Sequence, residues 1–442
     1  MKHNFLYLMF LFGLVSCTDE ILTEENSNIV QEAQETNYDI NYRSYAEALE
    51  IAQNSISMLE NDEADTRGGN TERVLNLENG VRAILQEDTR AGITDADNDT
   101  LIYIFNFKDK KGFAVVSACR QTDGLIAVVE SDSYEPGVLT GNPGFDSFMK
   151  MAELYVANES KNKFAETRAS ANPIMCKPVY DTIFNKRVTP KISVKWGQKQ
   201  VMGQFCPNKI SGCTNTAIAQ IMSYFKYPSS ISLTYSGRDV NTTSLDWAAM
   251  CNHTYTYVNS NRDTADIQIG RLARQLGKKT DSTYGSKSTS ATISNARSAL
   301  SSLGYTVGKI KKIETVNNNI DPDDMYTLAN DLAQNRLIYM RGENKKGRGH
   351  AWVVDGCYYV KALYRLMATY DGETWSVFKE MGTYRTCHNH INWGWNGMHN
   401  GYFNGWIFNA NMELEEDPGL FYNSYDSLAI FIKDFKYFAV TH

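Results

Sequence analysis

Apolar side chains recur at helical spacing near the middle of the chain, directly after a cysteine. Four of them lie at relative positions i, i+3, i+4 and i+7: Ile218, Ile221, Met222 and Phe225. This spacing predicts a helix with a buried face that ends before Pro228, because proline cannot continue a helix interior. Cys213 is therefore expected at or just before the N-terminus of a core helix.

Before this helix, the pattern predicts a small unit of mixed structure. Its expected elements are strands at 101–107, 113–118 and 125–129, a turn at 108–112, helices at 44–59 and 145–156, and loops over 60–99. The first helix begins with a capping box formed by Ser44 and Glu47. A small sheet with flanking helices can fold as its own unit.

After this unit, residues 159–172 are charged and without periodicity, which is typical of a linker and a cleavage region. The remaining expected elements are a helix at 272–276 ended by Gly277, a short buried strand at 349–356, a second strand end at 389–397 that turns at glycine, an elaborated hairpin at 357–388 and a strand-like tail at 427–438. The chain thus alternates between helical and strand segments and predicts an α+β protein.

The position of Cys213 has a chemical consequence. Free N–H groups and the positive end of the dipole stabilise an anion at a helix N-terminus, so a thiol there is biased toward the nucleophilic thiolate. A buried structural cysteine that caps a core helix would fit this stretch equally well. The choice between the two depends on the rest of the chain.

Two distant segments supply what a thiolate nucleophile needs. His350 lies at the start of the expected strand at 349–356, and Asn392 lies in the strand end expected at 389–397. A thiolate needs an imidazole to hold its proton, and the imidazole needs a polar group to fix its tautomer. The cysteine and histidine are 350 − 213 = 137 residues apart, within the roughly 130–150 residues found in papain-type enzymes.

Four motifs occur in one order along the chain: Trp196-Gly197-Gln198, Gly212-Cys213 followed by 217–222, the segment 349–356 and Asn392-Trp393-Gly394-Trp395. This set resembles the streptopain family of bacterial papain-like cysteine peptidases. The resemblance is strong from about Trp196 onward and weaker before it.

The resemblance implies a papain-like, two-lobed α+β fold preceded by a small α+β propeptide domain that keeps the zymogen inactive. It implies Cys213 as nucleophile, His350 as base and Asn392 as the residue that orients the imidazole. Gln198 would donate to the oxyanion, and Trp393 would cover the histidine–asparagine pair.

Two positions need separate comment. Thr214-Asn215 replaces the small apolar pair that is usual after the nucleophile in the family, which affects the pocket floor but not the nucleophile. The loop of Tyr284, Gly285 and Ser286 corresponds to one that the family implies can line a substrate pocket, whereas the residues alone indicate a plain turn.

The N-terminus predicts export. An apolar run from Phe5 to Val15 has the length of a signal peptide and ends in Leu14-Val15-Ser16-Cys17, which resembles a bacterial lipobox. Cys17 is then the expected lipidation site, although an ordinary signal peptide with an incidental cysteine is the alternative. The protein is expected at the outer membrane or cell surface, from which processing can release it.

Four regions follow from these patterns: a lipoprotein signal peptide at 1–16, a tether at 17–43, the propeptide domain at 44–168 and the papain-like catalytic domain at 169–442. The dipeptide Thr-Arg recurs in polar surroundings at 66–67, 89–90 and 167–168. Chance and processing after arginine both explain it, and Arg168 is the best placed candidate cut.

The composition of the chain limits which binding partners and cofactors are expected. A net charge of −7 and a pI near 5.6 argue against nucleic acid. Eight cysteines include no C-x-x-C pair, so no metal site is expected, and the mechanism needs no cofactor. Cys17 and Cys213 have assigned roles, and disulfide pairing among the other six is not readable. Four other histidines are expected on the surface or in structural hydrogen bonds: His253, His388, His390 and His399.

The sequence therefore predicts a cysteine endopeptidase, made as a latent lipoprotein zymogen, that cleaves protein or peptide substrates through an acyl-thioester. Its own propeptide is the expected intramolecular inhibitor, and a lipid anchor its contact with the membrane. A thiol acyltransferase would use the same intermediate but resolve it with an amine. A non-enzymatic surface-binding lipoprotein would be expected to have lost the nucleophile or base, and both are present.

Overall fold

The computed structural model describes residues 42–60, 73–85, 100–160, 175–235, 238–253, 264–316, 319–344, 347–369, 374–409 and 433–442. Several predictions fall outside these stretches, namely the signal peptide at 1–16, nearly all of the tether at 17–43, Cys17 and Arg168. No helix within the described stretches is long and apolar enough to cross a membrane.

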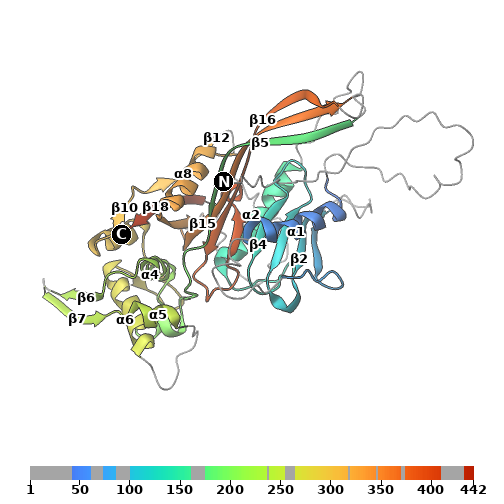
Figure 1. Ribbon diagram of the computed structural model, residues 1–442. Helices are drawn as coiled ribbons and strands as arrows, with labels where there is room; N and C mark the ends of the chain where they lie inside the picture. Colours follow the sequence, from blue (N-terminus) through green and yellow to red (C-terminus); the bar gives the residue numbers. More distant parts are fainter. Residues whose placement is uncertain are drawn as a thin grey trace, which may run out of the picture.

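One antiparallel sheet connects the whole described molecule. Its strands are β1 (Val81–Leu85), β2 (Thr100–Asn106), β3 (Phe113–Ser117), β4 (Leu125–Val129), β5 (Met175–Val188), β10 (Thr306–Val307), β11 (Lys311–Lys312), β14 (Leu337–Glu343), β15 (Gly349–Thr369), β16 (Ser376–Asn392), β17 (Gly401–Asn404) and β18 (Lys433–Thr441). Their order is β1-β2-β3-β4-β17-β16-β15-β14-β18-β10, with β5 on β15 and β11 on β18 (Figure 1). Chain order and spatial order therefore differ, because β4 lies next to β17.

The N-terminal part is the small mixed unit that the pattern predicts. Helix α1 (Tyr45–Glu60) starts at the predicted capping box, in which the Ser44 N–H donates to Glu47 Oε2 at 2.8 Å. It packs on one face of β2 and β3, and α2 (Pro143–Glu159) packs on the other face with Phe145, Phe148 and Val156 buried. This arrangement confirms the helices and the three strands expected before residue 160.

The sheet of this N-terminal unit continues directly into the rest of the molecule. Strand β4 pairs with β17, with Val129 opposite Gly401 and Ala127 opposite Phe403. The apolar core is also shared, because α2 side chains pack with Trp393 and Phe403 from the later part of the chain. The two parts therefore meet through a hydrogen-bonded strand edge as well as through side chains.

The remaining helices lie mostly on one face of the central strands. They are α3 (Gln200–Gly203), α4 (Cys213–Phe225), α5 (Trp247–Asn252), α6 (Thr264–Lys279), α7 (Ile293–Ser302) and α8 (Pro322–Ala333). Helices α4, α6 and α7 form one core with the β14 and β15 side chains that point toward them. Helix α8 packs into the core on the opposite face, together with α2. Figure 1 shows α4, α5 and α6 grouped apart from the N-terminal unit, and the combination of several helices with one large antiparallel sheet is the α+β class that was expected.

Short elements complete the described structure. They are the hairpins β6 (Ser230–Tyr235) with β7 (Arg238–Ser244), β8 (Thr283–Tyr284) with β9 (Thr289–Ser290) and β12 (Thr315–Val316) with β13 (Asn319–Ile320), and the 3-10 turns η2 (Lys108–Lys110) and η3 (Gly405–Ile407).

The main elements begin and end close to their predicted positions. Helix α4 begins at Cys213, and β15 pairs with β16 in one long hairpin, with Val353 opposite Asn392. The histidine strand and the asparagine strand are therefore neighbours. The part of the tail that the structure describes is β18, as expected.

Two local predictions are wrong. Residues 81–85 form β1 rather than a loop, because they pair with β2 although they do not alternate in polarity. Helix α6 does not end at Gly277 but runs on to Lys279. Gly277 has a different role, since a Cβ there would lie 1.9 Å from the Tyr284 hydroxyl.

Candidate active site

Cys213 occupies the first turn of α4. Gly212 precedes it with φ +87°, a conformation that L side chains rarely adopt, and a Cβ there would lie 2.7 Å from the Thr289 carbonyl oxygen. The Gly212 carbonyl accepts the Thr216 N–H at 3.0 Å, which starts the helix. The free N–H groups of this turn therefore lie beside the thiol, as the sequence predicts.

His350 lies at the start of β15 and interacts with the Cys213 thiol. Burial alone would raise the pKa of Cys213. The hydrogen bond and charge of His350 outweigh burial, with smaller contributions from Arg341 and the Ala351 N–H, and lower the pKa of the thiol to about 7. The thiol and imidazole that the sequence places 137 residues apart are thus brought together.

The second ring nitrogen of His350 contacts the backbone. His350 Nε2 lies 3.1 Å from the carbonyl oxygen of Trp393. A carbonyl can only accept, so this bond requires the proton on Nε2 and leaves Nδ1 to receive the thiol proton. The Trp393 carbonyl therefore selects the tautomer that a base for Cys213 needs.

Asn392 is buried beside this pair, with hydrogen bonds to three other groups. Its Oδ1 accepts from Gln220 Nε2 at 2.9 Å and from the Gly394 N–H at 3.1 Å, and its Nδ2 donates to the Val194 carbonyl at 3.1 Å. These bonds shape the turn that carries the Trp393 carbonyl. The contribution of Asn392 to imidazole orientation stays a prediction, and these bonds indicate that it acts through the turn.

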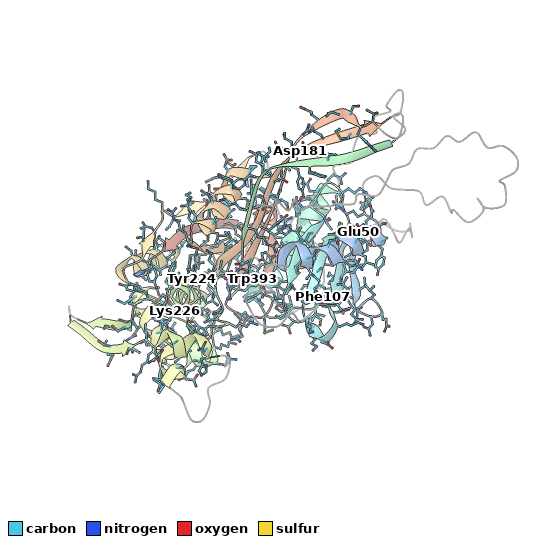
Figure 2. The ribbon with its side chains drawn as sticks, in the orientation of Figure 1. Glu50, Phe107, Asp181, Tyr224, Lys226 and Trp393 are labelled. Carbon is cyan, nitrogen blue, oxygen red and sulfur yellow. The ribbon has the colours of Figure 1, made fainter. Side chains whose placement is uncertain are left out.

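Trp393 lies next to the imidazole, and its role as a cover for the histidine–asparagine pair stays a prediction. Its ring centroid is 6.5 Å from that of His350, with 29° between the planes, and it also packs on Trp352 at 5.3 Å. The side chain is almost fully buried and lies near the centre of the molecule (Figure 2). The imidazole is therefore shielded from water on this side.

The backbone of Gln198 is tied to the nucleophile segment. Its carbonyl accepts both the N–H and the hydroxyl of Ser211, at 2.8 Å and 3.1 Å. Ser211 lies two residues before Cys213, so Gln198 is held close to the first turn of α4. The donation of its side chain to an oxyanion stays a prediction.

Arg341 is a residue that the sequence reasoning missed. On β14 it pairs with Ala351, and it points to the same face as Tyr339, whose hydroxyl donates to Thr214 Oγ1 at 3.2 Å. Its guanidinium bonds Glu343 at 3.0 Å and the Ala291 carbonyl at 3.3 Å. A buried arginine within the apolar run of β14 was the available sequence signal.

The predicted pocket loop lies on α6. Gly285 closes the β8–β9 hairpin through its N–H to the Ser288 carbonyl at 2.9 Å, and Tyr284 faces Gly277 and Arg274. The part of this hairpin that reaches the nucleophile is its end, since Thr289 contacts Gly212. A substrate role for Tyr284, Gly285 and Ser286 stays a prediction.

The first turn of α2 lies over the histidine. A Cβ on Gly144 would lie 2.4 Å from the Trp393 ring and 2.9 Å from His350 Cδ2. Asn142 caps this helix through Oδ1 and donates from Nδ2 to the Met398 carbonyl at 3.1 Å. The N-terminal unit therefore contacts the acid–base side of the site directly.

A second histidine marks the boundary between the two parts of the chain. His390 on β16 lies 2.6 Å from Asp355 and 2.9 Å from Glu130, which directly follows β4. Burial disfavours the charged ring, but the two carboxylates outweigh it and raise the pKa of His390 to about 10. Burial also acts against the charge of Glu130, yet His390 holds the pKa of that carboxyl down at about 2. We call Glu130, His390 and Asp355 the boundary triad.

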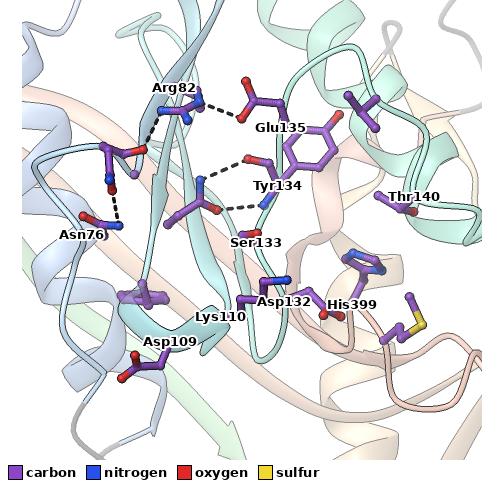
Figure 3. A pocket seen from close by; sticks show the side chains of 16 residues that line it. Asn76, Arg82, Asp109, Lys110, Asp132, Ser133, Tyr134, Glu135, Thr140 and His399 are labelled. Atoms are coloured by element: carbon purple, nitrogen blue, oxygen red, sulfur yellow. Dashed lines mark hydrogen bonds and ion pairs between the residues drawn. The ribbon is translucent and has the colours of Figure 1, made fainter.

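A polar pocket of about 500 Å³ lies elsewhere along the same boundary (Figure 3). It is lined mainly by residues of the N-terminal unit, including Arg82, Asp132 and Glu135, together with Met398 and His399. Neither Cys213 nor His350 lines it, so it is not the reaction site. Within the described residues, no group of three His, Cys, Asp or Glu side chains could hold a metal ion.

The other cysteines and histidines have different surroundings from those of Cys213 and His350. Six cysteines in the described stretches are free thiols: Cys119, Cys206, Cys213, Cys251, Cys357 and Cys387. Burial raises the pKa of Cys119, Cys206, Cys251, Cys357 and Cys387.

His388 is buried against the Leu125 carbonyl, which its Nε2 contacts at 3.0 Å, and burial lowers its pKa to about 4. His253 pairs with Asp266 and His399 stacks on Phe145, so these rings have the structural contacts that were expected.

The chain is similar to known proteins over much of its length. The model of the Peptidase C10 family matches residues 196–403. Streptopain from Streptococcus pyogenes is 25% identical over 361 residues, which cover 75% of this chain and 80% of streptopain. A solved fragment of prointerpain A from Prevotella intermedia aligns with a TM-score of 0.49 and 20% identity, covering 80% of this chain and 98% of the fragment. The family match spans Gln198, Cys213, His350, Asn392 and Trp393.

Proposed function

We propose that the chain is a cysteine endopeptidase of the Peptidase C10 family, whose model matches residues 196–403, and that it is made as a latent precursor. The observation that carries the proposal is the contact between the Cys213 thiol and the His350 imidazole, which holds the pKa of the thiol at about 7. A thiol with that pKa is partly ionised at neutral pH, whereas burial raises the pKa of Cys119, Cys206, Cys251, Cys357 and Cys387.

The proposed reaction is acyl transfer to the thiol followed by hydrolysis. The Cys213 thiolate attacks the peptide carbonyl, so that a C–S bond forms and the carbonyl oxygen becomes an oxyanion; collapse of this tetrahedral intermediate restores the C=O bond and breaks the C–N bond. Protonated His350 Nδ1 gives its proton to the leaving amine, and the neutral ring then takes a proton from the water that splits the thioester. The Cys213 N–H at the start of α4, with Gln198 as second donor, is the proposed oxyanion site.

Latency is the second part of the proposal. The first turn of α2 lies against His350 and Trp393, where a substrate chain would need access to the imidazole. The β4–β17 strand pairing and the boundary triad hold that unit in place. We expect activation to require release of the N-terminal unit after cleavage between 161 and 195, with Arg168 as the candidate cut.

Export is the third part and depends on the first seventeen residues. The apolar run that ends at Cys17 supports acylation of this cysteine and anchoring at the outer membrane or cell surface. Cys17→Ala is expected to move the protein from the membrane fraction to the soluble fraction. Equal membrane retention of the variant would refute the anchor without affecting the proposed chemistry.

An epoxide-type thiol-protease probe tests the activity. The probe is expected to label Cys213 strongly after limited proteolysis of the full chain and weakly before it, with parallel rates of peptide hydrolysis. Cys213→Ala should lose both label and hydrolysis, whereas the matched control Cys251→Ala should keep both. Full hydrolysis by the uncut chain would overturn latency, and hydrolysis by Cys213→Ala would overturn the nucleophile.

A further inference from the structure

Gln220 lies on the nucleophile helix, on the same side as Cys213. The two residues are 220 − 213 = 7 positions apart, which is two helical turns or about 10 Å along the axis. Gln220 has no exposed surface. A buried carboxamide in this place must direct its polar atoms into the protein interior rather than into water.

The carboxamide nitrogen of Gln220 is shared between two acceptors. Its Nε2 donates to the Trp196 carbonyl at 3.0 Å and to Asn392 Oδ1 at 2.9 Å. The first acceptor precedes Gly197-Gln198, and the second begins the turn whose Trp393 carbonyl contacts His350. One side chain therefore links α4 to the two other segments of the site.

The two hydrogen bonds that Gln220 Nε2 donates, which we call the Gln220 fork, also determine the orientation of the Asn392 carboxamide. Because Gln220 donates, the acceptor Oδ1 of Asn392 must point toward it, and the Gly394 N–H donates to the same oxygen. The Asn392 Nδ2 is then directed to the Val194 carbonyl. The turn at 392–394 is held from three sides, and the Trp393 carbonyl at its centre is held with it.

We propose that Gln220 is a positioning residue for the acid–base half of the site. Acting through Asn392 and the turn, it keeps the Trp393 carbonyl on His350 Nε2 and so keeps Nδ1 ready for the thiol proton. This inference rests on the proposed cysteine peptidase function and adds to it a residue that does not touch substrate.

A substitution at Gln220 can distinguish a positioning role from simple packing. Its Oε1 is buried and has no hydrogen-bond partner among the described residues. Gln220→Met keeps the length of the side chain and removes this unsatisfied oxygen, which offsets part of the lost hydrogen bonding. Stability should therefore change little, and a large loss of activity would reflect positioning.

Gln275 on α6 is a matched control. It is also buried, its Nε2 is also shared between two acceptors, the Asn241 carbonyl at 2.5 Å and Thr243 Oγ1 at 3.3 Å, and its Oε1 also has no partner among the described residues. Neither acceptor belongs to the site. Gln275→Met therefore reports what the loss of such a fork costs in stability alone.

The decisive experiment compares the two variants in the full chain after limited proteolysis. Gln220→Met is expected to lower kcat about tenfold or more, with little change in KM, because the reacting groups lose alignment rather than substrate contacts. Gln275→Met should keep kcat. Equal kcat for both variants, at matched thermal stability, would overturn the proposal.

A second readout does not depend on peptide hydrolysis. The pH midpoint for alkylation of Cys213 by iodoacetamide reports how well the imidazole stabilises the thiolate. We expect Gln220→Met to raise this midpoint and Gln275→Met to leave it unchanged. Cys213 of the wild-type chain could be alkylated near neutral pH while the chain hydrolyses no peptide. The proposed function would then fail, but the alkylation midpoint would still decide the role of Gln220.

A double variant tests the route through Asn392. Added to Asn392→Ala, Gln220→Met should cost much less in kcat than it costs alone, since the amide it orients is already absent. Gln220→Glu should be more damaging than Gln220→Met, because a carboxylate would face two acceptors. Fully multiplicative losses in the double variant would overturn the route through Asn392.

Discussion

Two histidines on adjacent strands of the same sheet have different kinds of partner. His350 begins β15 and His390 lies near the end of β16, and both are almost completely buried. Each meets a group supplied by a distant part of the chain. His350 meets the Cys213 thiol, whereas His390 lies between the carboxylates of Glu130 and Asp355.

The partner decides what each ring can do. The carboxylates keep His390 charged up to about pH 10, and Glu130 remains ionised down to about pH 2, so no proton moves between them over the physiological range. The thiol beside His350 has a pKa of about 7, so a proton can pass between sulfur and nitrogen. The first pair suits a fixed ionic link and the second suits acid–base chemistry.

Exchanging the two rings for glutamine separates these roles most strongly. His350→Gln should lower kcat by at least about a thousandfold after activation, because the thiol loses its base. His390→Gln should keep most of the activity of the cleaved enzyme. The measurement is peptide hydrolysis after limited proteolysis, with circular dichroism to show that both variants are folded. Loss of turnover in a folded His390→Gln, with activity kept in His350→Gln, would reverse the assignment.

The second largest loss of activity is expected from removing the proposed oxyanion donor. Gln198→Ala should lower kcat on the order of a hundredfold, since a donor to the developing oxyanion is removed. The epoxide probe should still label Cys213, because the thiolate and its base remain. An unchanged kcat in the folded variant would exclude Gln198 from the site.

The ionic link can be broken from the N-terminal unit. Glu130→Gln should raise the activity of the uncut chain several-fold, because His390 would lose one of its two carboxylates. The effect is limited since the Glu130 side chain is 35% exposed. The matched control is Glu135→Gln, which removes the exposed partner of Arg82 and should leave uncut activity unchanged. Equal rates for the two variants would show that the boundary triad does not hold the unit in place.

The same link predicts how the boundary responds to pH. The pKa of His390 is raised above its ordinary value of 6.5, so its contribution is complete below that value and is lost as the pH rises through about 10. The pKa of Glu130 is lowered, so its contribution is complete above 4.5 and is lost as the pH falls through about 2. Arg73 and Lys195 also face Glu130 and favour its charged form. After cleavage, the N-terminal unit should dissociate more readily at both extremes, which size-exclusion chromatography would detect.

The smallest expected effect concerns the second cation near the thiol. Arg341→Met should raise the pH midpoint of Cys213 alkylation by roughly half a unit, because a positive charge that favours the thiolate is lost. Arg336→Met, on a surface pair with Asp331, is the control and should not move the midpoint. A midpoint that is identical in all three proteins would show that His350 alone stabilises the thiolate.

The chain by itself determined the parts of the site that depend on local pattern. Helical periodicity after Cys213 predicted α4 with Cys213 at or just before its start, and the patterns at 349–356 and 389–397 predicted a buried strand and a second strand end. Local steric and polar preferences act over a few residues, and a single sequence displays them. The candidate set of Cys213, His350 and Asn392 followed from residue types and order.

Only the tertiary structure decided how these elements meet. The boundary triad joins residues 260 positions apart, and Gln220 meets Asn392 across 172 positions. β1 gives no alternating signal and exists because β2 pairs with it. Strand order and register place the first turn of α2 over His350 and direct the Arg341 side chain into the protein. Both depend on pairings between segments that are distant in the chain. Local sequence patterns do not predict these long-range pairings. The residues that position the site, supply its charges and cover it can therefore be identified only in the folded protein.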